Sequence, residues 1–173
     1  IKMIAFDINE HFMRNYKTQG SQFKAMLATN GKVEAIRYLD EFEELGDLEA
    51  AVIISPPDQR EGYSEVGEES KDIVVRFWQK MMDRYGDEET YEDTIKDEFV
   101  NGDELDLLIV VDKLLTGFDA PRATILYVDK PMKEHTLLQA IARVNRLYEG
   151  KDFGFIIDYR GLLDRLDEAM EMY

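Results

Sequence analysis

Two arginines and a glutamine share one face of a predicted helix near the carboxyl end of the chain. Arg143 and Arg146 are three residues apart, and Gln139 precedes Arg143 by four. Side chains at these spacings are neighbours on a helix, with Cβ atoms roughly 5–6 Å apart. Guanidinium groups stay charged and offer a planar fork of donors, so this set could clamp a phosphate. Spacing alone favours the alternative that both arginines bond surface carboxylates, which this acidic chain has in quantity.

A second set of residues follows an apolar run that ends at Val111. Thr116 and Gly117 lie where the backbone could approach a phosphate closely. Asp119 could accept a hydrogen bond from a ribose hydroxyl, although on its own it more simply stabilises a turn before Pro121. The two histidines and the scattered carboxylates show no metal-binding spacing.

The phosphate-cradling motif G-x-x-x-x-G-K-[ST] does not occur in the sequence, and no Asp-Glu pair for Mg²⁺ evidently follows a strand. If the chain works with ATP, it must therefore complete a site that is built elsewhere.

Composition restricts the class of protein. A chain of 173 residues suits one domain, and the lack of cysteine excludes disulfides, thiolate zinc sites and a cysteine nucleophile. No apolar run approaches the ~20 residues of a membrane span, and the first residue, Ile1, suggests a fragment of a longer protein. The net charge of −16 argues against a nucleic-acid partner. Residues 40–106 carry almost all of this acidity, so we expect any anion-binding surface to come from the two ends. The acidic segment is most simply a solvated surface.

Hydrophobic periodicity predicts helices that alternate with strands. The helices are expected at residues 3–16, 32–45, 71–85, about 88–100, 134–148 and about 160–171. The strands are expected at residues 23–28, 50–54, 105–111, 124–128 and 153–157. Gly46 is a plausible helix C-cap, and a long polar loop leads to Ser70. This order predicts an α/β fold with a mostly parallel sheet, whose ligands lie outside the carboxyl ends of the strands.

The residues 114–121 (LLTGFDAP) and 139–146 (QAIARVNR) together resemble motifs V and VI of superfamily 2 helicases. The residues of both motifs, together with FGFIIDY at residues 153–159, are similar in sequence to the motor (R) subunit of type I restriction enzymes. The sequence has Ala142 where many superfamily members have glycine, and Thr116 where many have arginine. Both departures are usual in the type I branch.

The resemblance implies a RecA-like three-layer sandwich, a P-loop NTPase-type fold without its own Walker A motif. Residues 1–173 would form a single helicase C-terminal motor domain, with a linker helix at residues 1–20 and a C-terminal helix at 160–173. This second motor domain would complete an ATP site for translocation of double-stranded DNA coupled to endonucleolytic cleavage. As part of an ATP-dependent type I deoxyribonuclease it would be a cytoplasmic hydrolase component, incomplete as a catalyst by itself.

The resemblance also implies a role for each site residue. Arg146 and Arg143 would reach the γ-phosphate of ATP, which the preceding motor domain would hold with Mg²⁺, and Gln139 would position the phosphate or the attacking water. Gly117 would admit the nucleotide and Asp119 would bond its ribose. Thr116 and, more weakly, Thr29 would touch the DNA backbone.

The implied partners are the preceding RecA-like domain and the nuclease domain of the same subunit, the methyltransferase and specificity subunits, and double-stranded DNA, without a membrane. Three alternatives stay open: a motor domain of another superfamily 2 helicase or remodeller, a degenerate module that binds partners through its acidic middle, and an unrelated α/β nucleotide-binding domain. The last would bind nucleotide tightly in isolation, whereas a half-site would bind it weakly.

Overall fold

A five-stranded, all-parallel sheet forms the centre of the protein, in the order β2-β3-β1-β4-β5. The computed structural model describes residues 1–57, 67–114, 118–144 and 154–161, without the side chains of Arg143 and Val144. The strands are β1 (Lys24–Thr29), β2 (Ala50–Ile53), β3 (Leu107–Val110), β4 (Ala123–Asp129) and β5 (Phe155–Asp158). Every residue of β1, β3 and β4 is buried, as expected for strands covered on both faces. The α/β fold predicted from the sequence is confirmed.

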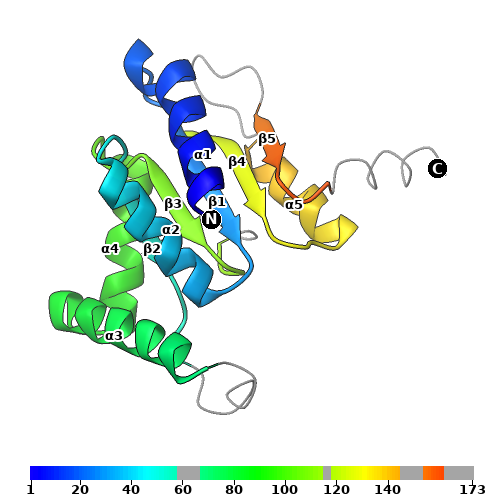
Figure 1. Ribbon diagram of the computed structural model, residues 1–173. Coiled ribbons are helices and arrows are strands. Elements are labelled where there is room, and N and C mark those ends of the chain that lie inside the picture. Colours follow the sequence, from blue (N-terminus) through cyan, green and yellow to red (C-terminus); the bar gives the residue numbers. More distant parts are fainter. Residues whose placement is uncertain (58–66, 115–117, 145–153, 162–173) are drawn as a thin grey trace.

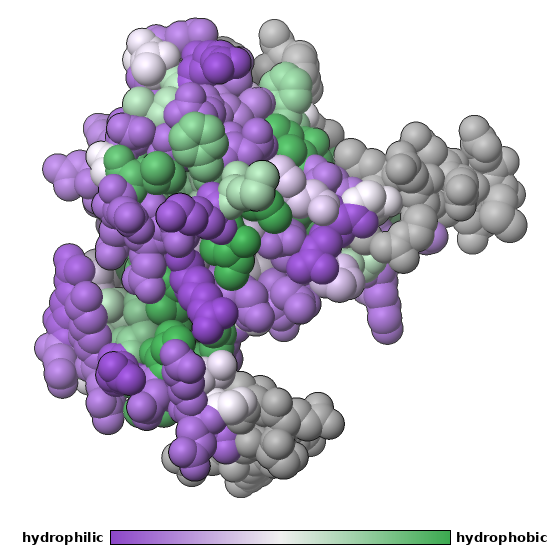
Figure 2. All heavy atoms as spheres, in the orientation of Figure 1, coloured by the Kyte–Doolittle hydropathy of each residue, from purple (hydrophilic) through white to green (hydrophobic). Residues whose placement is uncertain are grey.

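Helices cover both faces of the sheet (Figure 1). The α-helices are α1 (Lys2–Asn15), α2 (Lys32–Leu45), α3 (Glu68–Tyr85), α4 (Glu88–Asn101) and α5 (Glu134–Val144). Helices α1 and α2 pack together on one face, α4 and α5 lie on the other, and α3 packs on α2 and α4 beyond the β2 edge. Figure 2 shows that the face carrying α1 and α2 is mostly hydrophilic.

Local sequence explains where several helices begin and end. Gly46 caps the carboxyl end of helix α2: its φ of 75° is left-handed, and its N–H donates to the carbonyl of Phe42. Asp87 caps the amino end of helix α4: its carboxylate accepts from the N–H of Thr90 at 2.7 Å. Buried Lys24 bonds the carboxyl end of α4: its Nζ donates to the carbonyls of Glu98 and Gly102 at 3.1 and 2.6 Å. A cation at this position compensates the partial negative charge of the helix end.

Helix α1 belongs to the core of the domain. Ala5, Ile8 and Phe12 are buried, and the Nδ1 of His11 lies 2.8 Å from the hydroxyl of Tyr127 on β4. The predicted linker of residues 1–20 is therefore packed on the sheet, and a short 3₁₀ helix at Lys17–Gln19 follows it. The helix predicted at 160–171 falls almost wholly outside the described residues.

Candidate functional site

The connection from β3 to β4 carries the first predicted site segment, and the structure anchors it on both sides of residues 115–117. Lys113 forms ion pairs with Glu88 and Glu92 of α4, at 3.5 and 3.1 Å. Burial opposes the charge of Lys113, but the two glutamates outweigh it and raise its pKa. Beyond the segment, Phe118 stacks on Phe99 of α4 with ring centroids 6.2 Å apart. Both anchors hold the connection against the same helix.

Leu114 has a φ of 71°, in the left-handed region that a branched side chain rarely occupies. Such strain persists only where the surroundings enforce it, and it clusters at functional loops. The two predicted residues that follow, Thr116 and Gly117, lie outside the described residues.

Asp119 lies away from the carboxyl edge of the sheet, where ligands of a parallel sheet were expected to bind. Because β4 is parallel to β3, the connection must return to the amino edge before Ala123, and the N–H of Ala123 already bonds the carbonyl of Ala120 at 2.9 Å. The side chain of Asp119 is exposed beside this turn. Its position suits a contact with a group outside the domain, and the ribose role stays a prediction.

Helix α5 directs Gln139, the one predicted site residue on this helix whose side chain is described, to solvent. Leu137 and Ala140 are buried, whereas Gln139 is exposed. Arg143 follows Gln139 by four residues, so its Cα lies on the same face of the helix. The side chain of Arg143 and all of Arg146 lie outside what the structure describes.

Thr29 ends β1 with its side chain fully buried. Its hydroxyl lies 3.2 Å from the carbonyl of Val110 and 3.3 Å from that of Gly31. The hydroxyl therefore bonds the protein itself and is not presented to DNA in this structure.

The carboxyl edge of the sheet holds lysines that sequence reasoning missed. Lys130 donates to the carbonyl of Val111 at 2.7 Å and to the carboxylate of Asp112 at 2.5 Å, and so ties the end of β4 to the end of β3. Lys32 begins α2 and donates to the carbonyl of Pro56 at 2.6 Å. A cavity of about 80 Å³ between Lys32, Ser55 and Lys113 is too small for a nucleotide. Spaced far apart in the sequence, these lysines form no motif that periodicity could detect.

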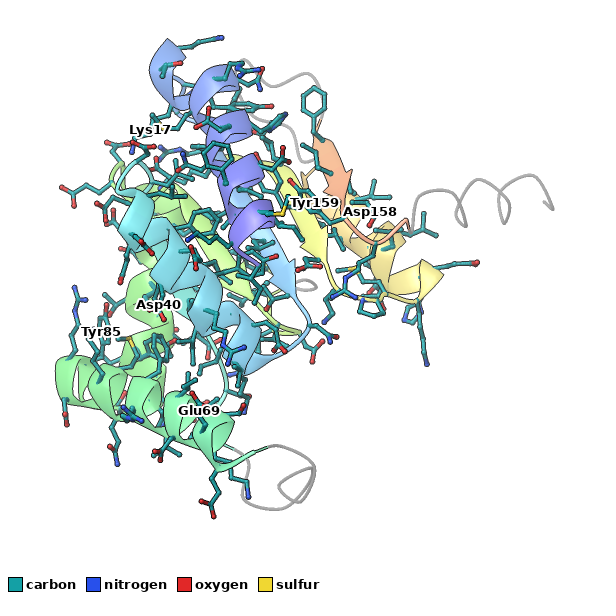
Figure 3. All side chains as sticks on the ribbon, in the orientation of Figure 1. Lys17, Asp40, Glu69, Tyr85, Asp158 and Tyr159 are labelled. Atoms are coloured by element: carbon teal, nitrogen blue, oxygen red, sulfur yellow. The ribbon has the colours of Figure 1, made fainter. Side chains whose placement is uncertain are left out.

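Asp129 connects this edge to α2 and to the turn after β5. Its carboxylate accepts from the hydroxyl of Tyr38 at 2.5 Å and from Nε of Arg160 at 2.7 Å. Burial and the bond to Asp129 raise the pKa of Tyr38 far above its ordinary value. Next to this network, the hydroxyl of Tyr159 donates to Asp7 of α1 at 2.5 Å, and Figure 3 shows Tyr159 beside that helix. The turn after β5 is therefore held to α1 directly and to α2 through Asp129.

No three His, Asp or Glu side chains in the described part of the chain are grouped so that they could hold a metal ion. None of the helices within the described ranges is both long and apolar enough to span a membrane.

The parallel sheet, its helical layers and its connections define an α/β domain of the RecA-like class. The C-terminal part of the Fun30 ATPase domain has a similar fold, with a TM-score of 0.55 at 12% identity, over 95% of this chain and 44% of that one. Residues 21–161 match the family described as type I restriction enzyme subunit R domain 3, and the chain belongs to that family.

Relatives in Methanocaldococcus jannaschii agree with this assignment. The putative type I restriction enzyme MjaVIIP endonuclease subunit is 37% identical over 168 residues, which are 90% of this chain and 15% of that subunit. The MjaVIIIP endonuclease subunit is 32% identical over 184 aligned residues, all of this chain and 17% of the relative. The chain thus spans a small part of the length of these relatives.

Proposed function

We propose that the chain is the second motor domain of a type I restriction R subunit and completes an ATP site whose phosphate-binding loop lies in the preceding motor domain. The observation that carries this proposal is the orientation of α5, which turns the face of Gln139 to solvent while Leu137 and Ala140 hold the helix on the sheet. Arg143 lies on that face, and Arg146 follows it by three residues. A face with this composition suits phosphate brought by another domain.

Two of the described residues support the proposal of half a nucleotide site. Asp119 and Gln139 are exposed and can contact a ligand held across a domain boundary. The preceding domain would supply the metal and the phosphate-binding loop. Arg146 and Arg143 neutralise the charge that develops on the γ-phosphoryl group, and Gln139 positions the phosphate or the attacking water. Arginine fingers of this kind are worth about 10³–10⁵ in rate.

The proposed motor moves along double-stranded DNA. Closure of the two motor domains around ATP, and opening after hydrolysis, would move the protein along the duplex if each domain grips phosphates. In this chain we propose that Thr116 makes such a contact, and that Lys32 and Lys113 at the carboxyl edge exchange their bonds to Pro56 and to Glu88 and Glu92 for phosphates. These contacts are independent of sequence and weaken with salt. A nuclease domain of the same subunit, with the methyltransferase and specificity subunits, would supply cleavage and target recognition.

The test is DNA-stimulated ATP hydrolysis by the parent subunit, including its upstream motor domain. Arg146→Ala should reduce kcat by at least about a thousandfold while ATP binding is largely kept. Arg76→Ala is the matched control, because Arg76 is exposed on α3 and bonds only Asp72 within the described residues. Turnover by Arg146→Ala equal to that of the control would overturn the proposal.

A further inference from the structure

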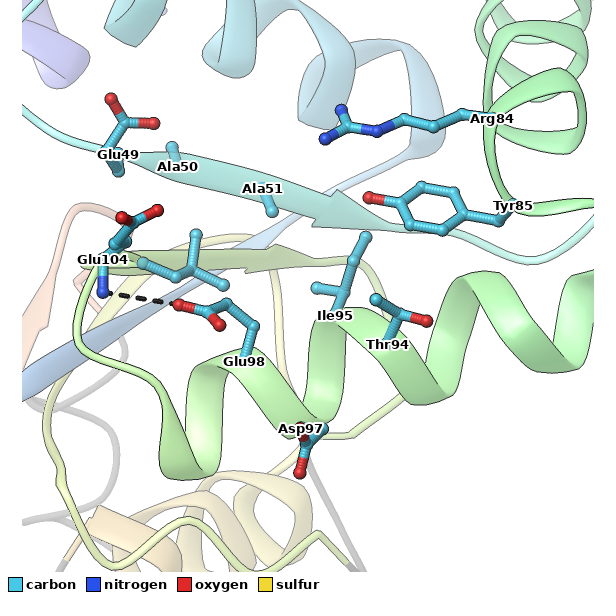
Figure 4. Close-up of a pocket in the computed structure, with 11 residues that line it drawn as sticks. Glu49, Ala50, Ala51, Arg84, Tyr85, Thr94, Ile95, Asp97, Glu98 and Glu104 are labelled. Carbon is cyan, nitrogen blue, oxygen red and sulfur yellow. Dashed lines mark hydrogen bonds between the residues drawn. The ribbon is translucent and has the colours of Figure 1, made fainter.

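The free edge of the sheet at β2 borders a groove of about 450 Å³ (Figure 4). The groove lies at the amino ends of β2 and β3. It is therefore away from the carboxyl edge of the sheet, where Thr29 ends β1 and Asp129 ends β4. The carboxyl-terminal turn of α3 and one side of α4 form its walls. Two alanines in succession, Ala50 and Ala51, leave room along the strand.

The backbone of β2 offers unused hydrogen-bonding groups in this groove. Successive residues of a strand direct their N–H and C=O groups to opposite sides, and the carbonyl of Glu49 points to β3, where it accepts from Leu107. The groups of Ala50 and Val52 therefore point outward. The hydroxyl of Tyr91 confirms this direction, because it donates to the outward carbonyl of Val52 and accepts from the N–H of Ile54.

Tyr91 closes the carboxyl half of the edge and leaves the amino half open. The N–H and C=O of Ala50 and the N–H of Val52 have no partner among the described residues. An extended peptide can use such groups as a short added strand.

The charge of the groove selects the kind of peptide. Four carboxylates line it, and none of them forms a salt bridge within the described part of the chain: Glu49, Asp97, Glu98 and Glu104. Arg84 is the only basic residue among the described residues of the lining, and its guanidinium lies over the ring of Tyr85 at 5.3 Å. A second copy of this chain would bring the same carboxylates to the edge, and like charges would oppose that pairing.

We propose that this groove binds an extended peptide segment of a protein partner, with lysine or arginine at alternate positions, which adds to the edge of β2 beside Ala50. Backbone bonds to Ala50 and Val52 hold the segment, and the carboxylates select its basic side chains. The site requires no nucleotide and is separate from the α5 face, so its failure would leave the proposed motor function untouched.

The test is fluorescence anisotropy with the 173-residue chain and two labelled peptides, one that alternates valine with lysine and one that alternates valine with glutamate. The lysine peptide should bind saturably, more tightly than the glutamate peptide, and more weakly as salt increases. A version with N-methylated backbone amides should lose this binding.

Variants connect the binding to the groove. The double variant Glu49→Gln, Glu104→Gln should weaken binding about fivefold, as expected for two partly screened charges. The control Glu43→Gln, Glu44→Gln has the same change of charge on exposed residues of α2 outside the groove, and should bind as the wild type does. Ala50→Pro removes an outward N–H without removing a bond to β3, and should also weaken binding.

Three results would overturn the proposal. They are equal affinity for the two peptides, equal loss of affinity in the groove variant and its control, and self-association of the chain through β2 without peptide binding. Thermal unfolding of each variant establishes that it is folded. If Ala50→Pro does not fold, the double variant Glu49→Gln, Glu104→Gln still tests the proposal.

Discussion

Tyr38 of α2 and Asp129 of β4 are joined by a buried hydrogen bond of 2.5 Å, although 90 positions of sequence lie between them. Tyr38 has no exposed surface and Asp129 is 8% exposed. Because Asp129 also accepts from Arg160, one carboxylate connects helix α2, strand β4 and the turn after β5. The Tyr38–Asp129 bond therefore holds the carboxyl end of β4, the strand that precedes α5.

Tyr38→Phe should lower the free energy of unfolding by about 1.5–3 kcal/mol, because a hydrogen bond to a carboxylate is lost in a buried place. Urea unfolding at neutral pH measures the change. Tyr85→Phe is the control, since Tyr85 makes no hydrogen bond with the described residues, and it should change stability little. Equal losses for the two variants would show that the bond to Asp129 contributes nothing.

Lys24 should make stability increase with pH above about 8. Burial, helped by the charge of Arg122, lowers the pKa of Lys24 to about 8, whereas an unfolded chain keeps the ordinary value of 10.5. Between these values the unfolded state binds more protons than the folded state, so the free energy of unfolding rises with pH. Below about pH 8 both states are protonated and the effect is absent.

Lys24→Met should abolish this rise, and chemical unfolding of both proteins between pH 7 and pH 10 measures it. The buried tyrosines have raised pKa values and act in the opposite direction near pH 10, but they are common to both proteins. The difference between the two curves therefore isolates Lys24. Parallel curves would contradict the prediction.

Phe118→Ala should reduce kcat for DNA-stimulated ATP hydrolysis by the parent subunit by about tenfold or more. The connection 111–122 loses one of its two anchors on α4, and a small displacement of site residues lowers the rate strongly. The free energy of unfolding should fall by only about 1–3 kcal/mol. Phe118→Leu should recover part of the rate. Phe155→Ala, at an exposed position on β5, is the control; a rate loss as large in this variant would point to a general effect of stability.

Tyr91→Phe should destabilise the domain by about 1–3 kcal/mol, because it leaves the carbonyl of Val52 and the N–H of Ile54 without their buried partner. Hydrogen exchange at the amide of Ile54 should become faster, while amides in the centre of β1 follow only the change in global stability. An unchanged exchange rate at Ile54 would mean that water replaces the hydroxyl without cost.

Local patterns predicted much of the fold and little of the packing around the site. Residues 32–45 were predicted as a helix and form α2 with the same bounds, because apolar spacing and Gly46 are both local signals. Helix α3 begins at Glu68 rather than at residue 71, since its first turn carries carboxylates that suit a helix start but has no apolar residue.

The site residues show where sequence reasoning stops. Thr29 was expected to face DNA, but its burial depends on β1 lying between β3 and β4, which only the tertiary structure determines. The position of Asp119 depends on the edge at which β4 enters the sheet. The pairs Lys130–Asp112 and Tyr38–Asp129 join residues 18 and 91 positions apart, so the short periodicities of helices and strands do not reveal them.

The strand order also has a consequence for synthesis. The central strand β1 is made first, yet both of its neighbours come much later: Ala25 pairs with Leu107 and with Ile125. During translation the wholly apolar middle of β1 must wait, with both edges unpaired, until residues 107–129 have left the ribosome. Such high contact order slows folding and exposes nascent chains to aggregation. We therefore expect this domain to depend on chaperones during expression, and the acidic helices α3 and α4, made in the interval, to keep the unfinished chain in solution.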